Sequence, residues 1–110
     1  MTSVVCARTS NEAAELAKLN PSFIAIEPPE LIGSGRAVSK ETPKTISDSV
    51  KLVSENSKST EVICGAGIVD KSDVCSALDL GVKGILVASG IIKADCWYEK
   101  LSELGSGFVT

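Results

Sequence analysis

Short apolar runs alternate with amphipathic stretches along the 110-residue chain. The apolar runs predict β-strands near residues 3–7, 23–27, 61–64 and 84–87. Each run is followed by a stretch with apolar residues at helical spacing, as in Ile46, Val50 and Val53. Strands that are apolar throughout are typical of parallel sheets with helices packed outside them. The pattern therefore predicts an α/β fold of four parallel strand–helix units.

Residues that typically begin helices precede the predicted helices. Thr9 and Glu12 have the spacing of a capping box, and Pro43 suits the first turn of a helix because its missing N–H costs nothing there. Asp70 and Asp95 are each expected to cap the helix that follows them. These signals predict where the helices begin, independently of the apolar periodicity.

Two further stretches complete the expected organisation. Residues 39–42 are expected to be the exit from a loop. Residues 1–104 are expected to form one domain, and residues 105–110, which begin Gly-Ser-Gly, a flexible tail. Because the chain begins at Met1 just before a strand, an engineered boundary is also expected.

One acidic residue, Glu27, ends the second apolar run and is followed by an unusual segment. We call that segment the lid segment, and it comprises Pro28, Pro29, Glu30, Leu31, Ile32, Gly33, Ser34 and Gly35. The two prolines end the strand and stiffen the backbone, whereas the glycines permit conformations that other residues avoid. This arrangement suggests a catalytic base under a closing lid. A strand followed by a turn, with a solvated glutamate, is the alternative.

Composition excludes several classes of function. The net charge is −3 with no basic run, so no nucleic-acid partner is expected. No apolar stretch approaches the roughly 20 residues that cross a bilayer, so no membrane association is expected. The chain has no histidine, and Cys6, Cys64, Cys75 and Cys96 are scattered. No metal and no cofactor are therefore expected, and the thiols are expected to be free in a reducing cytoplasm.

Three motifs in order resemble the C-terminal half of triosephosphate isomerases. They are Ala25-Ile26-Glu27-Pro28 with Ile32-Gly33-Ser34-Gly35, then Cys64-Gly65-Ala66-Gly67, then Gly84-Ile85-Leu86-Val87-Ala88-Ser89-Gly90. The sequence Pro28-Pro29-Glu30-Leu31 is similar to the corresponding segment in the archaeal branch of this family. The resemblance implies half of a (β/α)₈ barrel, equivalent to its units five through eight.

The resemblance also implies roles for individual residues. Glu27 would be the base that moves a proton between two adjacent carbons of a triose phosphate. Backbone N–H groups of Gly33, Gly67, Ala88 and Ser89 would bind its phosphate, or inorganic phosphate or sulfate in its place. The chain departs from the most widespread family pattern at Gly67, where many members carry serine, and at Ala88-Ser89, where they carry two glycines. Backbone donors survive both changes.

The family mechanism also needs a lysine and a histidine from the first half of the barrel. This chain lacks any histidine, so Glu27 alone is expected to be nearly inert. One hypothesis is therefore an enzyme fragment, natural, proteolytic or engineered, that needs the missing N-terminal half-barrel as a partner. Another is a non-catalytic half-barrel that associates with a second copy of itself. A third is a different phosphate-binding barrel, such as an indole-glycerol-phosphate or thiamine-phosphate type.

Overall fold

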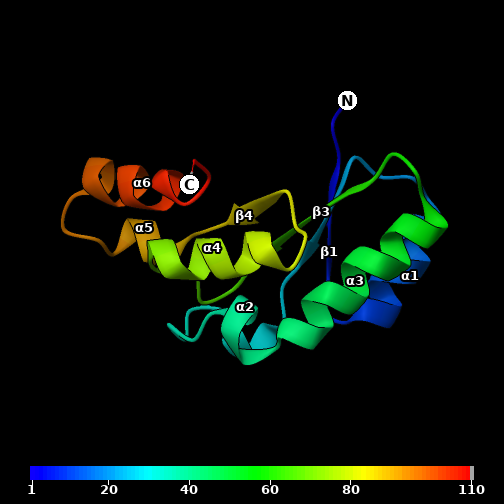
Figure 1. Cartoon of the computed structure of the whole chain (residues 1–110), viewed down its shortest axis with the longest axis horizontal. Helices are drawn as coiled ribbons and strands as arrows, with labels where there is room; N and C mark the ends of the chain where they lie inside the picture. The colour runs from blue at the N-terminus through cyan, green and yellow to red at the C-terminus, as the bar shows by residue number, and fades with distance from the viewer. Residues whose placement is uncertain (110) are drawn as a thin grey trace.

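A computed structural model of the chain describes residues 1–109, and four parallel strands form a single sheet in this part of the chain (Figure 1). The strands lie in the order β1-β2-β3-β4. Their bounds are Val4–Ala7 for β1, Phe23–Ile26 for β2, Glu61–Gly65 for β3 and Gly84–Leu86 for β4. The four predicted strands and their parallel arrangement are confirmed, with ends that differ by one residue.

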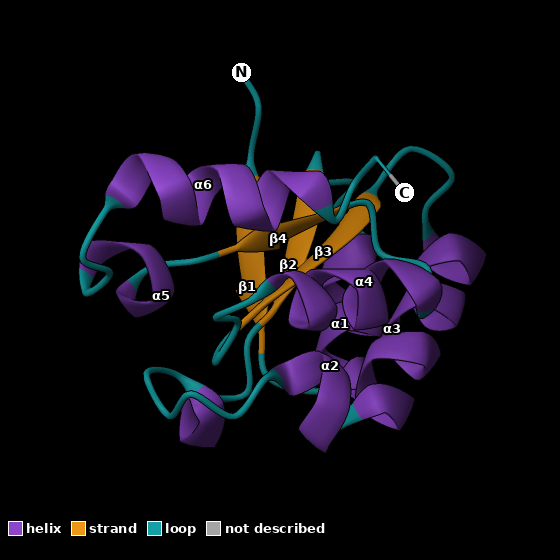
Figure 2. Ribbon diagram, turned by 60° about the vertical axis from the view of Figure 1, so that its left-hand side comes forward, coloured by secondary structure: helices purple, strands orange, loops and turns teal. Residues whose placement is uncertain are grey.

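Helices follow every strand, as the alternating pattern predicts. The longer ones are α1 (Ser10–Ala17), α3 (Pro43–Asn56), α4 (Lys71–Asp79) and α6 (Trp97–Ser106). Shorter ones are the 3₁₀ helix η1 (Pro29–Leu31), α2 (Val38–Glu41) and α5 (Ser89–Ile92). Figure 2 shows the helices wrapped around the outside of the sheet.

The structure confirms two of the predicted helix starts fully and one in part. Pro43 occupies the first turn of α3, and Asp70 caps α4 in a complete capping box with Asp73. Thr9 accepts the N–H of Glu12 at 3.1 Å, but the Glu12 carboxylate accepts the N–H of Arg8 rather than that of Thr9. The first capping box is therefore only half formed, because Glu12 also pairs with the Arg8 guanidinium.

Two local predictions are wrong. Residues 39–42 are not simply a loop exit, since α2 covers Val38–Glu41 and Val38 donates its N–H to the carbonyl of Ala66 at 3.1 Å. Asp95 does not cap α6, whose N-cap position is Cys96 and carries no side-chain hydrogen bond. The indole N–H of Trp97 instead donates to Ile92 at 3.1 Å, which holds the turn that precedes the helix.

The last helix also runs past the predicted start of the tail at residue 105. α6 continues through Ser106, whose hydroxyl donates to the carbonyl of Glu103 at 2.6 Å. Gly107 is buried, and a Cβ there would lie 2.7 Å from Cγ1 of Val74. The boundary expected at residue 104 therefore falls inside a helix packed on α4. Residue 110 of the predicted tail lies outside the described residues.

Alternation along the strands separates two faces of the sheet. The face toward the helices carries the buried core, which includes Ala7, Ile24, Ile26, Val62 and Cys64. The opposite face, which we call the inner face, carries Val4, Cys6, Ala25, Ile63 and Leu86, since the register aligns Cys6 with Ala25, Ala25 with Ile63, and Gly65 with Leu86. Val4 is 50% exposed and Leu86 is 36% exposed. The inner face is therefore only partly covered.

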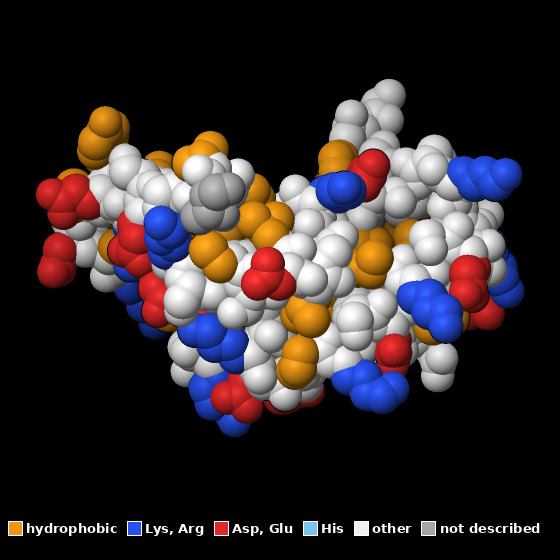
Figure 3. All heavy atoms as spheres, in the orientation of Figure 1, with side chains coloured by type: hydrophobic (Ala, Val, Ile, Leu, Met, Phe, Trp, Pro, Cys, Tyr) orange, Lys and Arg blue, Asp and Glu red, His pale blue; other side chains and the backbone are white. Residues whose placement is uncertain are grey.

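Both edges of the sheet are strands with a single neighbour within the described part of the chain, β1 at one edge and β4 at the other. An open parallel sheet of this kind leaves backbone hydrogen-bonding groups unpaired along its edges. Charged side chains of both signs are interspersed over the outer surface in Figure 3, and apolar side chains gather in the hollow of its upper outline. Within residues 1–109, every helix is too short or too polar to span a lipid bilayer.

Candidate active site

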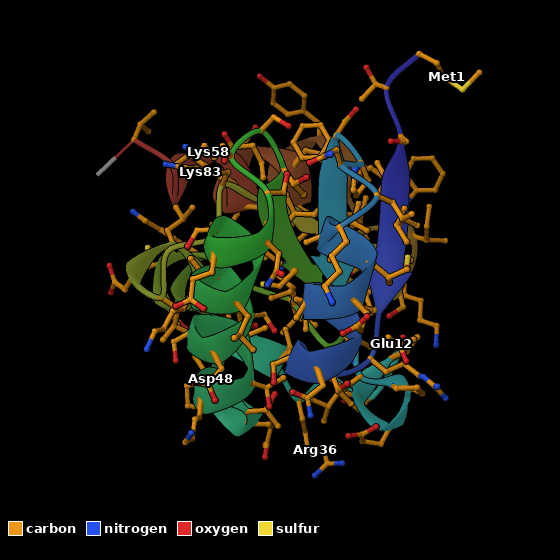
Figure 4. All side chains as sticks on the ribbon, turned by 90° about the vertical axis from the view of Figure 1, so that its right-hand side faces the viewer. Met1, Glu12, Arg36, Asp48, Lys58 and Lys83 are labelled. Atoms are coloured by element: carbon orange, nitrogen blue, oxygen red, sulfur yellow. The ribbon has the colours of Figure 1, made fainter. Side chains whose placement is uncertain are left out.

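The carboxyl ends of the four strands lie at the same end of the sheet, and a cavity of about 340 Å³ lies there. All five residues to which the resemblance assigns chemistry line this cavity, namely Glu27, Gly33, Gly67, Ala88 and Ser89. They come from the loops that follow β2, β3 and β4. Figure 4 shows Arg36, which follows the lid segment, at this end of the molecule, and Lys58 and Lys83 at the opposite end. The sheet therefore brings together residues that are far apart in the sequence.

Glu27 lies one residue beyond β2, where the strand ladder still holds its backbone. Its N–H donates to the carbonyl of Ala7 at 2.9 Å. Since side chains alternate along the strand, Glu27 lies on the inner face with Ala25. A Cβ at Gly65 would lie 3.3 Å from Cδ of Glu27 and 3.0 Å from the carbonyl oxygen of Leu86. The glycine at position 65 therefore leaves room for the carboxylate at the mouth of the cavity.

Cys6 is a neighbour of Glu27 that the motifs do not identify. Its Sγ lies 3.6 Å from Oε1 of Glu27. Partial burial, followed by the negative charge of Glu27, raises the pKa of the Cys6 thiol above its ordinary value. Alternation along the first strand indicated only that Cys6 and Val5 point to opposite faces of the sheet. The contact itself depends on the register between β1 and β2.

The lid segment combines a rigid start with a glycine-rich tip. Pro28 is buried and leads into η1, where Leu31 is 3% exposed and anchors the segment to the core. Beyond it, Gly33 has φ +72° and Gly35 has φ +76°, a region that favours glycine. The Ser34 hydroxyl donates to the carbonyl of Leu31 at 2.7 Å, which closes the turn between them. The tip is exposed, and Gly33 faces the cavity.

The β3–α4 loop, residues 66–70, has a backbone conformation that few sequences allow. Ala66 has φ +81° and Gly67 has φ +73°, so two successive residues lie in the left-handed region. A Cβ at Gly67 would overlap the carbonyl oxygen of Arg36, the residue that follows the lid segment. A serine, which many members of the family that this chain resembles carry here, therefore does not fit this arrangement. Its absence here allows close contact between the loop and the lid.

The loop after β4 closes the cavity from the other side. Ser89 and Gly90 begin α5, and the first N–H groups of a helix have no acceptor within it. A Cβ at Gly90 would overlap the carbonyl oxygen of Ile68, so this loop packs directly on the β3–α4 loop. Small residues thus let the backbones of the three loops pack closely around the cavity. An anion with several oxygens suits such a site.

Cationic side chains lie beside the cavity rather than inside it. Lys93 and Lys100 line an adjoining hollow of about 350 Å³ together with Gly33 and Ser34 of the lid. Lys100 already donates to the carbonyl of Val69 and to Glu103, both at 2.9 Å. Residues 1–109 contain no group of three or more His, Cys, Asp or Glu side chains arranged to hold a metal ion.

The match to a family model decides the relationship of this chain to known proteins. The model for triosephosphate isomerase matches residues 1–104. The chain belongs to the triosephosphate isomerase family. A triosephosphate isomerase of Archaeoglobus fulgidus is 50% identical over 104 residues, which cover 94% of this chain and 47% of that protein. One from Cenarchaeum symbiosum is also 50% identical, over 94% of this chain and 46% of the relative.

The chain therefore spans about half the length of the curated triosephosphate isomerases that it matches. Four parallel β/α units over half that length form half of a (β/α)₈ barrel. The resemblance inferred from the three ordered motifs is confirmed at the level of the family.

Solved structures add a similarity of fold. A thiamine phosphate pyrophosphorylase from Pyrococcus furiosus superimposes with a TM-score of 0.72 and 20% identity over 94% of this chain and 46% of its own. A BexX/CysO complex from Amycolatopsis orientalis gives a TM-score of 0.76 and 15% identity, over 98% of this chain and 41% of that one. At these identities the similarity concerns the fold alone. The 50% identity to triosephosphate isomerases therefore outweighs the thiamine-phosphate alternative.

Proposed function

We propose that this chain supplies the catalytic base and the phosphate-binding loops of a triosephosphate isomerase. The reaction is the interconversion of glyceraldehyde 3-phosphate and dihydroxyacetone phosphate, a step of glycolysis and gluconeogenesis that takes place in the cytoplasm. The main support is the cavity in which Glu27 and the four small phosphate-loop residues meet. Free cysteines at all four positions are in keeping with a reducing compartment.

Glu27 would act by moving one proton. Its carboxylate takes a proton from the carbon next to the substrate carbonyl, and the electron pair of that C–H bond forms the double bond of an enediolate. The resulting carboxylic acid then returns the proton to the neighbouring carbon, while the hydroxyl proton passes from one enediolate oxygen to the other, so that the base is regenerated and the carbonyl has changed place. Exclusion of water by the lid segment favours this transfer.

The phosphate group would be held away from the reacting carbons by backbone donors. Gly33, Gly67 and Ser89, whose N–H groups would be the donors, line the cavity from three different segments of the chain. Fixing the phosphate in these loops orients the carbon acid toward Glu27. Polarisation of the carbonyl, in contrast, needs an electrophile, and this chain has no histidine to supply it. That group would come from a complementary first half-barrel.

Complementation tests this function. The 110-residue chain alone is expected to show no appreciable isomerisation, whereas addition of the N-terminal half of an archaeal relative should produce it. Activity that requires both halves supports the proposal. Absence of activity in a mixture that forms a stable 1:1 complex would count against it, and activity of the lone chain would refute the need for a complementary half.

A second candidate function is a non-catalytic half-barrel that associates with a copy of itself. The observation that favours it is the partly covered inner face, together with the unpaired edges of β1 and β4. Two sets of four parallel strands supply the eight strands that close a barrel of this class. Sedimentation at several concentrations distinguishes the two candidates, because self-association predicts a concentration-dependent dimer in the absence of any other chain.

A further inference from the structure

Asp73, a buried carboxylate outside the proposed active-site cavity, joins the β3–α4 loop, which lines this cavity, to the segment that follows the lid. It lies in the first turn of α4 and is 3% exposed. Its Oδ2 accepts the N–H of Val69 at 2.9 Å and that of Asp70 at 3.3 Å. Its Oδ1 pairs with the ammonium group of Lys40 at 2.8 Å. Asp73 therefore binds both the β3–α4 loop and a residue that follows the lid.

The segment that follows the lid, residues 36–40, is named the lid hinge. Two hydrogen bonds hold the lid hinge on the β3–α4 loop and on the first turn of α4. Val38 donates its N–H to the carbonyl of Ala66 at 3.1 Å, and the Ser39 hydroxyl donates to the carbonyl of Asp73 at 2.9 Å. Val38 is fully buried and Ser39 is 4% exposed. The lid hinge is thus packed against the loop and against the start of α4, beside which α2 lies.

Helix capping explains only part of what the Asp73 carboxylate does. Of the two N–H groups bound by Oδ2, that of Asp70 belongs to the capping box, whereas that of Val69 lies one residue before the N-cap. Lys40 on Oδ1 has no part in capping, and its side chain remains 46% exposed while that of Asp73 is 5% exposed. The hydrogen bond to Asp73 is the main cause that raises the pKa of Lys40. A carboxylate this deeply buried needs partners for both oxygens, and the lid hinge provides the second.

We propose that Asp73 is a positioning residue that fixes the lid hinge against the loop carrying Gly67. The inference deepens the proposed function and rests on it, because Gly33 of the lid and Gly67 of the loop would contact one phosphate group. The prolines hold the lid at its start, and Asp73 holds it at its end through Lys40. The distance between the two glycine donors is then set before a phosphorylated ligand enters.

Hydrogen exchange of the Val38 amide in the ligand-free, full-length chain tests the link directly. Lys40→Met keeps the aliphatic stem and removes the charge, whereas Lys40→Arg keeps the charge. Lys44→Met is the matched control, since it removes an exposed ion pair with Asp48 in α3. We expect exchange at Val38 to be on the order of tenfold faster in Lys40→Met and close to wild type in the other two variants.

Equal Val38 exchange in Lys40→Met and Lys44→Met would overturn the positioning role. Should Lys40→Met unfold the chain, with fast exchange throughout α3, Asp73→Asn provides the second measurement. That variant keeps the shape of the side chain and removes the charge that pairs with Lys40, and it should also speed exchange at Val38. Unchanged exchange in Asp73→Asn would then overturn the proposal.

A titration with inorganic phosphate separates this inference from the proposed function. In the wild-type chain phosphate should slow exchange of the lid amides, and Lys40→Met should need several-fold more phosphate for the same effect. No effect of phosphate on the wild-type chain counts against the proposed function, while fast Val38 exchange in ligand-free Lys40→Met still supports the link. An equal phosphate requirement in Lys40→Met and Lys44→Met would overturn the coupling.

Discussion

The sulfur of Cys6 lies 3.6 Å from Oε1 of Glu27, although the two residues are 21 positions apart in the sequence. Parallel pairing of β1 with β2 places them on the same face of the sheet, at the ends of neighbouring strands. The thiol is therefore a hydrogen-bond donor to the proposed catalytic carboxylate. Its pKa is raised by burial first and by the Glu27 charge second.

The first prediction concerns the reactivity of this thiol. Cys6 and Cys96 are both exposed, but only the thiolate reacts, so the raised pKa of Cys6 should make its alkylation near pH 8 slower than that of Cys96. Glu27→Gln removes the negative charge that raises the Cys6 pKa, so alkylation of Cys6 should become faster at the same pH. Mass spectrometry of iodoacetamide-treated chain, with Cys96 as the internal reference, gives both rates. A Cys6 rate that does not respond to Glu27→Gln would contradict the contact.

The same substitution should remove activity from the complemented barrel. The glutamine side chain has nearly the shape of glutamate but cannot accept the proton, so the isomerisation rate should fall by about 10²–10⁴. Assembly with the first half-barrel should be unaffected, and sedimentation of the mixture checks this. Glu41→Gln, an exposed carboxylate on α2, is a matched control that should retain the wild-type rate. Full activity of the Glu27→Gln complex would disprove the assignment of the base.

Gly67→Ser should disturb the lid rather than improve phosphate binding. The added Cβ would overlap the carbonyl oxygen of Arg36, and φ +73° at this position is unfavourable for any residue with a side chain. We expect weaker phosphate binding and a lid more accessible to limited proteolysis. Gly105→Ser is the control, because a Cβ there meets nothing within 4 Å. Unchanged lid protection in Gly67→Ser would show that the lid end moves aside at no cost.

Asp70 should stabilise the chain as the N-cap of α4. Its side chain accepts the N–H of Asp73 at 2.9 Å, and Asp70→Ala should lower the free energy of unfolding by about 1 kcal/mol. That hydrogen bond is the main cause that lowers the pKa of Asp70 in the folded state. A lowered pKa means that the charge-dependent stabilisation is present above the unfolded pKa of about 3.9 and is lost as the pH falls through the folded value.

Urea denaturation of wild type and Asp70→Ala at pH 7 and at pH 3 tests both parts. The difference between the two proteins should be larger at pH 7 than at pH 3. Asp70→Asn is the matched control, since asparagine also caps helices but carries no charge to titrate. A difference that grows as the pH falls would contradict the sign of the effect.

A final prediction concerns association through the inner face. Leu86 is 36% exposed there, and Leu86→Lys should weaken any dimer or complemented complex by placing a charge in an apolar interface. Leu19→Lys is the control, because Leu19 is 76% exposed and lies beyond the end of α1. Analytical ultracentrifugation at several concentrations measures both variants. Equal association constants for the two would indicate that the inner face is not the contact.

The sequence by itself determined the features that depend on near neighbours along the chain. The four strand–helix units, Pro43 in the first turn of α3 and the Asp70–Asp73 capping box all follow from interactions within a few residues. The ordered motifs around Glu27, Gly67 and Ala88 also identified the family, since each motif is a short continuous segment. These residues line one cavity.

Tertiary structure decided what depends on register and packing. Alternation shows that Val5 and Cys6 point to opposite faces, but only pairing with β2 shows that Cys6 shares the inner face with Glu27. The helix α2 forms where the apolar pattern indicated a loop exit, since its hydrogen-bond and ion-pair partners lie in the β3–α4 loop and in α4. Lys40 meets Asp73, and Arg36 meets Gly67, across more than thirty residues of chain. No local pattern encodes such contacts, because they exist only after the parallel strands have brought their loops to one edge.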